Sequence, residues 1–168
     1  VILTGDHGYT LFDDFRKLYP DKFINVGVAE ANLATIASGL ARAGFKPLIY
    51  GLASFVPTRV FEFLKMQVAL PELPVTVVGD GAGLVYSQLG HSHQSLEDLS
   101  LMTSLSGFNV YSPSSDSEAM TVLISSSDGP KYVRLGKSEG SFRGGFPNDE
   151  VRPYRIFGAG NNKVAVLA

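Results

Sequence analysis

The chain has 168 residues, 45% of them hydrophobic and 18% charged, which suits one compact α/β domain with a sizeable core. Its formal net charge of -2 leaves no basic surplus, so binding to nucleic acid or to an anionic membrane surface is not expected. The absence of cysteine excludes disulfides and thiolate metal sites and favours a cytoplasmic protein.

Six short apolar runs predict the strands of one sheet. They cover residues 1–3, 23–26, 47–50, 75–78, 109–111 and 132–135. Helix-like segments lie between most of them. This alternation predicts a three-layer α/β sandwich around a mostly parallel six-stranded sheet. No apolar run reaches the roughly 18 to 20 residues that a membrane-spanning helix needs, and the N-terminus lacks the charged region of a signal peptide.

The clearest predicted helix begins near Glu30. Apolar residues recur after it at helical spacing, and Gly44 stands where a C-terminal cap belongs. A second helix is expected to open at Pro57 and to end before Pro71. Its inward face would consist of Val60, Phe61, Leu64 and Val68.

Two further helix starts are predicted from capping-box spacing, in which a serine precedes an acidic residue by three positions. One pair is Ser95 with Asp98, and the other is Ser115 with Glu118. We expect the helices that follow to run to about residues 106 and 126.

The predicted domain covers residues 1–137. Residues 138–162 are rich in glycine and polar residues and are expected to form a linker. Residues 163–168 are apolar and are predicted to be the first strand of a truncated C-terminal domain. Since the chain both begins and ends on strand-like sequence, we expect it to be cut from a longer polypeptide.

Ligands of open parallel sheets bind outside the carboxyl ends of the strands, so the loops after the predicted strands are the first place to look for a site. The first of these loops to hold a candidate is Gly27-Val28-Ala29-Glu30. Glu30 could simply stabilise the N-terminus of its helix through the helix dipole. It could also be a buried carboxylate that faces a ligand nitrogen, with Gly27 allowing close backbone approach.

Phe55 follows the next apolar strand, in the loop Gly51-Leu52-Ala53-Ser54-Phe55, and Arg59 lies one helical turn further on. An aromatic residue in such a loop is most often part of the core. Its place beyond the carboxyl end of a strand also suits a stacking face for a flat heterocycle.

The long loop of residues 79–94 contains four glycines and ends in His91-Ser92-His93-Gln94. Two histidines two positions apart could be ordinary polar loop residues or half of a metal site. No third ligand lies at a metal-like spacing, so no metal site is assigned to this chain. A substrate-facing acid/base or hydrogen-bonding role fits the histidines better.

In this order, the motifs resemble the central, pyrimidine-binding domain of transketolases and 1-deoxyxylulose-5-phosphate synthases, over about residues 1–137. Gly27-Val28-Ala29-Glu30 resembles the family's glutamate motif, and Ser54-Phe55 its aromatic cofactor loop. Ser92-His93-Gln94 resembles its Thr-His-Gln loop. Tyr132-Val133-Arg134-Leu135 resembles the strand that presents an arginine to a sugar phosphate.

The resemblance implies a thiamine-diphosphate-binding fold and a role for each matching residue. Glu30 would be catalytic, because its carboxyl would bond the pyrimidine ring of thiamine diphosphate and so activate the cofactor. Phe55 would stack on that ring, with Val28 as a further cofactor contact. His93 would bind substrate hydroxyls and help to move protons, and the remaining substrate contacts would be His91, Gln88 and Arg134.

The family's diphosphate and magnesium site lies on a different domain and binds across a subunit seam. Gly79-Asp80-Gly81 resembles one half of that motif, but the only Asn pair, Asn161-Asn162, lies 80 residues beyond Gly81 (161 − 81), so we reject this assignment. A partner domain or subunit would supply the site, in a homodimer or a heterotetramer. The chain would then be the C-terminal section of a split transketolase or a fragment of a full-length one.

Two positions depart from the family pattern. Gly81 stands where the synthases have an arginine, and Gln88 falls on the family's sugar-reading aspartate when one residue is inserted in the loop. These departures concern the substrate more than the cofactor. The loop containing His91 and His93 also resembles that of 2-oxo-acid dehydrogenase beta subunits, which is the alternative enzyme. A non-catalytic ligand-binding module on the same fold is the third hypothesis.

Overall fold

Six parallel strands form one sheet in the computed structural model, which describes residues 1–125 and 128–137. Each predicted apolar run contains one strand, to within two residues at either end. The strands are β1 (Ile2–Thr4), β2 (Phe23–Asn25), β3 (Leu48–Leu52), β4 (Thr76–Asp80), β5 (Asn109–Tyr111) and β6 (Lys131–Arg134). Every pairing is parallel, so the sheet is fully rather than mostly parallel.

The strand order β2-β1-β3-β4-β6-β5 places a topological switch at β1. The chain moves from β1 to β2 on one side and then crosses over to β3 on the other. In open parallel sheets, the crevice outside the carboxyl ends of the strands at such a point is where ligands bind. The loops that follow β1, β2 and β3 all lie at this edge of the sheet.

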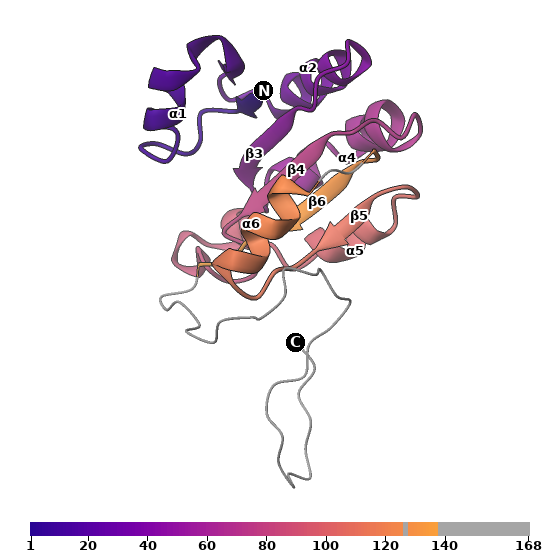
Figure 1. Ribbon diagram of the computed structural model, residues 1–168. Coiled ribbons are helices and arrows are strands. Elements are labelled where there is room, and N and C mark those ends of the chain that lie inside the picture. Colours follow the sequence, from indigo (N-terminus) through magenta and orange to yellow (C-terminus); the bar gives the residue numbers. More distant parts are fainter. Residues whose placement is uncertain (126–127, 138–168) are drawn as a thin grey trace, which may run out of the picture.

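Helices cover both faces of the sheet and give the three predicted layers (Figure 1). Neighbouring residues of a strand point to opposite faces, so Val77 of β4 packs with one apolar cluster and Val78 with the other. The larger cluster lies under α2 (Glu30–Arg42), α3 (Val56–Arg59), α4 (Phe61–Phe63) and α5 (Asp98–Thr103). The smaller lies under α6 (Asp116–Ile124), around Val122 and Val133.

Helix α2 matches its prediction, since it begins at Glu30 and Gly44 follows it in a left-handed conformation with φ of 88°. The prediction of one continuous helix from Pro57 is wrong, since the structure has three successive segments there. Helix α3 stops at Arg59, because the backbone of Val60 leaves the helical region with φ of -116° and ψ of 18°. Helix α4 follows, and residues Leu64–Ala69 then continue as a wider π-helical turn.

Of the two predicted capping boxes, the one at Ser115 is confirmed. Its hydroxyl accepts from the backbone N–H of Glu118 at the start of α6, although α6 ends at Ile124 rather than near 126. The one at Ser95 is wrong: its hydroxyl has no hydrogen-bond partner among the described residues, and its backbone pairs with Gly83. Helix α5 begins at Asp98 and ends at Thr103, short of the predicted 106.

The short helix α1 (Asp13–Leu18) was not predicted; it has only six residues, and none of them is buried. Phe12, just before it, packs edge-on against Tyr50 of β3 at 5.0 Å between ring centroids. The predicted linker and the strand at residues 163–168 lie outside the described residues. Within the described part, no helix is long and apolar enough to cross a bilayer.

Candidate functional site

Four loops at the carboxyl edge of the sheet bring together residues that are far apart in the sequence. His7 follows β1, Glu30 follows β2, Phe55 follows β3 and His93 lies in the loop after β4. Since parallel strands all end at the same edge, their loops converge there. Contacts among these four side chains and Arg59 define the candidate site.

Glu30 is the buried charge of the site. Its side chain is 8% exposed, and its Oε1 accepts a hydrogen bond from Nη1 of Arg59 at 2.8 Å. Burying a carboxylate is costly unless it is paired, and Arg59 provides that pair from the next helix. The described residues provide a bond to Oε1 only, so Oε2 is the oxygen left for a ligand.

Phe55 is the centre of the site. The Arg59 guanidinium lies over its ring, with Cζ 4.0 Å from the ring centroid, which is a close cation–π contact. The ring of His93 meets it edge-on at 5.2 Å, and the ring of His7 lies tilted against it at 5.9 Å. The half-buried ring of Phe55 thus contacts the arginine of the Glu30–Arg59 ion pair and two imidazoles.

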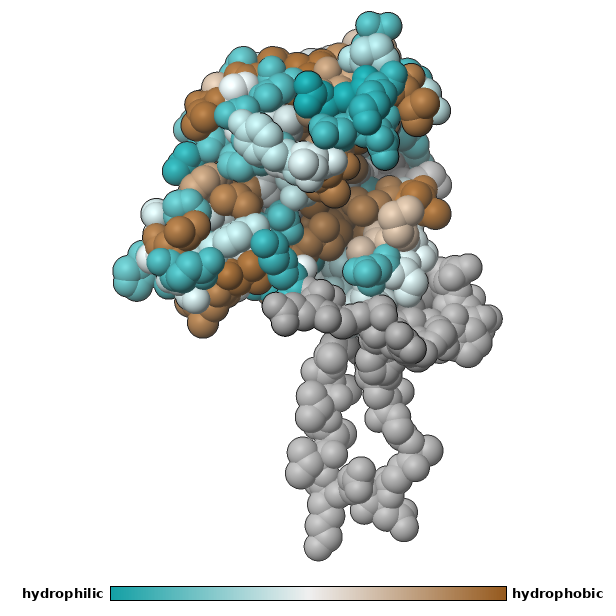
Figure 2. Space-filling view, turned by 90° about the vertical axis from the view of Figure 1, so that its left-hand side faces the viewer, coloured by the Kyte–Doolittle hydropathy of each residue, from teal (hydrophilic) through white to brown (hydrophobic). Residues whose placement is uncertain are grey.

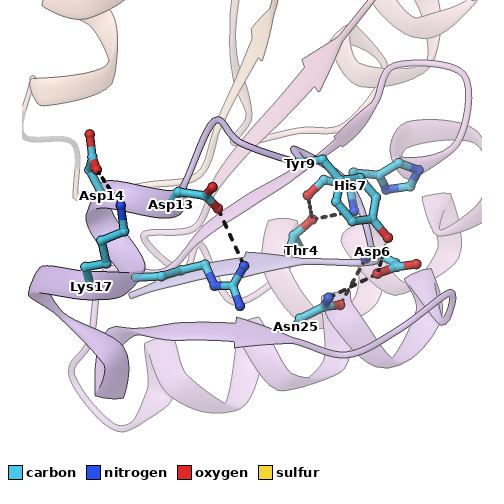
Figure 3. A network of polar contacts seen from close by, with 9 residues as sticks. Thr4, Asp6, His7, Tyr9, Asp13, Asp14, Lys17 and Asn25 are labelled. Carbon is cyan, nitrogen blue, oxygen red and sulfur yellow. Dashed lines mark hydrogen bonds and ion pairs between the residues drawn. The ribbon is translucent and has the colours of Figure 1, made fainter.

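The loop after β1 is held in place by a polar network (Figure 3). Thr4, which is buried, donates its hydroxyl to the carbonyl of His7 at 2.9 Å and accepts from the N–H of His7 at 3.1 Å. Asn25, at the end of β2, accepts from the backbone N–H groups of Asp6 and Gly27 at 3.0 and 2.9 Å. Asn25 therefore ties the His7 loop to the loop that leads into Glu30.

His7 is half-buried, and its surroundings favour the neutral ring. Burial lowers the pKa of the His7 imidazole below its ordinary value, and the charge of Arg59 lowers it further. The carboxylates of Glu30 and Asp6 oppose this effect without reversing it. Nδ1 of His7 is buried and has no hydrogen-bond partner among the described residues.

Arg134 ends β6 in a second polar group, next to the glycine-rich loop. Its Nε donates to Oδ2 of Asp98 at 2.8 Å, and the hydroxyl of Tyr132 donates to the same oxygen at 2.9 Å. Burial and the charge of Asp98 raise the pKa of the Tyr132 hydroxyl. Nε of Arg134 is therefore already bonded within the protein, which leaves the terminal N–H groups as the part that can reach an anion.

The glycine-rich loop after β4 is fixed at both ends. Gly83 pairs with Ser95 in an isolated antiparallel bridge, and Ala82 donates its N–H to the carbonyl of Leu135. Oδ2 of Asp80, the carboxylate that resembled a metal ligand, accepts from the Tyr50 hydroxyl at 2.8 Å. No group of three His, Cys, Asp or Glu residues in the described part could hold a metal ion.

The predicted site residues Val28, Gln88 and His91 are exposed to solvent, Val28 to 74%. Within the described part of the chain, no aromatic contact or hydrogen bond joins their side chains to Glu30 or Phe55. Figure 2 views the molecule from the left-hand side of Figure 1, and there brown apolar residues are interspersed with teal polar ones.

His7 and Asp98 are two residues of these groups that were not assigned a site role from the sequence. His7 was not singled out, because nothing local links it to Phe55, 48 positions away (55 − 7). Asp98 was interpreted as part of a capping box. The sequence signal available for both was their position in a loop region, since His7 lies three residues after the first strand and Asp98 follows the histidine loop.

Comparisons with known proteins agree with this architecture. Residues 2–141 match the family model described as "Transketolase, pyrimidine binding domain". The chain is 37% identical, over 72% of its length, to a 6-deoxy-6-sulfo-D-fructose transketolase subunit from Clostridium sp. (strain MSTE9), and covers 38% of that protein. It is 36% identical, over 79% of its length, to a 1-deoxy-D-xylulose-5-phosphate synthase from Mycolicibacterium gilvum, and covers 21% of it.

Among solved structures, a split-gene transketolase described as an inactive beta4 tetramer is 35% identical to the chain. The TM-score is 0.71, and the match covers 82% of this chain and 45% of that one. The chain thus spans about a fifth to a little under half of the relatives named here.

Proposed function

The chain belongs to the transketolase pyrimidine-binding domain family, and from this we infer that it is the pyrimidine-binding part of a thiamine-diphosphate-dependent, transketolase-type transferase. The proposed reaction transfers a two-carbon ketol unit between sugar or sugar-phosphate substrates in the cytoplasm. The observation that carries the proposal is the buried Glu30 carboxylate, connected through Arg59 to the half-buried ring of Phe55.

These residues fit an aminopyrimidine ring. Oε2 of Glu30 offers one acceptor for a ring N–H, and Phe55 offers a flat apolar surface for stacking. Arg59 already covers Phe55 at 4.0 Å, so the ligand ring would use the face of Phe55 that Arg59 leaves uncovered. Val28, exposed beside Glu30, would be a further apolar contact.

When bound, thiamine diphosphate supplies the carbon nucleophile that attacks a ketose carbonyl. Glu30 would bond the pyrimidine ring and hold or share a proton there, while Arg59 keeps the carboxylate in place. His93, at the edge of Phe55, would bind the substrate hydroxyls and move protons. His91 and Gln88, exposed in the same loop, would be outer substrate contacts.

A partner module is a necessary part of this proposal. The described residues hold no acidic cluster for magnesium, and the diphosphate site would come from a second domain or subunit. The similarity to a chain whose beta4 tetramer is inactive supports the same requirement. The working assembly would be a homodimer or a heterotetramer in which the cofactor lies between modules.

The proposed donor is a ketose with one anionic anchor. Terminal N–H groups of Arg134 can pair with a phosphate or sulfonate oxygen while Nε stays on Asp98. The two curated relatives act, by name, on a sulfonated sugar and in the synthesis of a sugar phosphate, so anionic sugars suit this group. Gly81 and Gln88 replace charged positions, which predicts an altered hydroxyl pattern in the substrate.

The test compares wild type with Glu30→Gln in the assembled enzyme, that is, this chain with its diphosphate-binding partner. Gln can still accept from Arg59 but cannot share a proton with the pyrimidine. We expect an unchanged melting temperature and a loss of donor turnover of about 10²-fold or more. Near wild-type turnover by a folded Glu30→Gln enzyme would overturn the proposal. Acyl transfer to a lipoyl group by the wild type would instead identify a 2-oxo-acid dehydrogenase subunit.

The chain alone is the second arm of the test. We expect weak binding of thiamine diphosphate with magnesium and no turnover until the partner is added. Tight, magnesium-dependent binding by the chain alone would contradict a divided site.

A further inference from the structure

His7 stands at the candidate site with no role in the proposed chemistry. Its ring lies against Phe55 at 5.9 Å, while His93 meets the same ring at 5.2 Å. Arg59, which lies over the same Phe55 ring at 4.0 Å, connects this aromatic group to Glu30. A residue in this position will neighbour whatever molecule stacks on Phe55.

The structure holds His7 in position through its backbone. Both the N–H and the carbonyl of His7 are bonded to the buried hydroxyl of Thr4. The preceding residue, Asp6, has φ of 65°, in the left-handed region that costs energy for a residue other than glycine. Asn25 holds Asp6 there by accepting from its N–H and donating to its carboxylate at 3.2 Å. Figure 3 shows these contacts between the ends of β1 and β2.

The two ring nitrogens of His7 differ in what they can reach. Nδ1 is buried, and a side-chain carbon placed on Gly51 would lie 3.8 Å from it, so this nitrogen faces the end of β3. The ring as a whole is only half-buried. Nε2 is therefore the nitrogen left to meet a ligand, and no hydrogen bond within the described residues uses it.

From this geometry we propose that His7 is a further ligand-binding residue of the Glu30–Phe55 site. Its neutral ring donates Nε2–H to an acceptor atom of the molecule bound there. Nδ1 then carries no proton, and no N–H is left buried without an acceptor. The acceptor is an oxygen or nitrogen atom with a free lone pair. It can belong to the cofactor or to the ketose donor. This inference rests on the function proposed above.

The test uses the assembled enzyme with [15N]histidine and follows the ring nitrogens of the three histidines by NMR. His7→Phe identifies the His7 signals and keeps an aromatic ring against Phe55. Thiamine diphosphate with magnesium is added first, and a phosphorylated ketose second. We expect the neutral Nε2–H tautomer at pH 7 and a shift of its Nε2 signal in one of these two steps. The step that produces the shift identifies the source of the acceptor.

Binding and kinetics give the second readout. His7→Phe is expected to raise the Kd of the cofactor or the KM of the donor by about 3- to 10-fold, the effect of losing one neutral hydrogen bond. His7→Gln, whose amide can reach a similar position, should recover part of that loss. Lys17→Ala, which removes an exposed ion pair with Asp14, is the matched control and should change neither constant.

Two results would overturn the inference. One is a wild-type enzyme that binds and turns over while the His7 signals stay unmoved. The other is a His7→Phe enzyme with unchanged Kd and KM. If the wild type neither binds thiamine diphosphate nor depends on Glu30, the proposed function itself fails. If His7→Phe does not fold, His7→Gln and the wild-type NMR titration still decide the question.

Discussion

Arg134 donates Nε–H at 2.8 Å to Asp98, a residue 36 positions earlier whose side chain is completely buried. Tyr132 bonds to the same carboxylate oxygen. This pairing fixes the direction of the Arg134 side chain, which is 23% exposed at the end of β6. The anion-binding role proposed for Arg134 therefore depends on a residue from the far end of the histidine loop.

Arg134→Ala is expected to reduce kcat/KM for phosphorylated ketoses by about 10- to 100-fold, since a charge-assisted hydrogen bond contributes roughly 1.5–3 kcal/mol. Unphosphorylated ketoses should be affected much less. Steady-state kinetics of the assembled enzyme on both groups of donors measure the difference. If every phosphorylated donor that works keeps its kcat/KM, Arg134 is structural and the substrate assignment fails.

Arg59→Met removes the partner of Glu30 and the cation over Phe55 together. We expect thiamine diphosphate to bind about 3- to 10-fold more weakly, because the carboxylate is no longer held for the ligand. The effect is kept modest by solvent, since the Arg59 side chain is 49% exposed. Calorimetric titration of the assembled enzyme measures it. Arg59→Lys keeps the charge but loses the flat stack, so it should fall between Arg59→Met and wild type. Equal affinities in all three would show that Arg59 does not position Glu30.

Gly79→Ala tests the contact between β4 and β6. A Cβ at this position would overlap the hydroxyl of Tyr132, whose bond to Asp98 leaves it no room to yield. Overpacking of this kind costs about 1–3 kcal/mol of stability. Urea denaturation of the full chain measures it.

The matched control is Gly39→Ala, on the exposed side of α2, where an added Cβ meets nothing within 4 Å. That change should stabilise the chain by about 0.5–1 kcal/mol. Equal stability of both variants would mean that Tyr132 can move away from β4.

His7 predicts how stability changes with pH. Because its pKa is lowered in the folded state, the unfolded chain takes up a proton first as pH falls below about 6.5, the ordinary histidine value. The contribution of His7 to the free energy of unfolding is therefore fully present above that pH and decreases below it. Urea denaturation of wild type and His7→Phe between pH 8 and 5 should show a steeper loss in the wild type. Parallel curves would show that the His7 ring is not kept neutral by folding.

The sequence by itself determined the six strands, helix α2 and the start of helix α6. Short apolar runs and the helical repeat after Glu30 are local signals, so the six strands and α2 were predicted from them. The capping box at Ser115 is equally local. Glu30, Phe55 and His93 were found as candidates because each follows a strand that could be recognised in the same way.

Only the tertiary structure decided which of these residues meet. The contacts of Glu30 with Arg59, of Phe55 with His7, and of Arg134 with Asp98 join separate loops, and they arise from the strand order of the sheet, which no local pattern encodes. Ser95 also shows that local patterns do not decide such pairings, since it was predicted to cap a helix and instead forms a bridge with Gly83. The physical reason is that pairings across the carboxyl edge depend on how all six strands are arranged together, whereas helix and strand periods depend only on near neighbours in the chain.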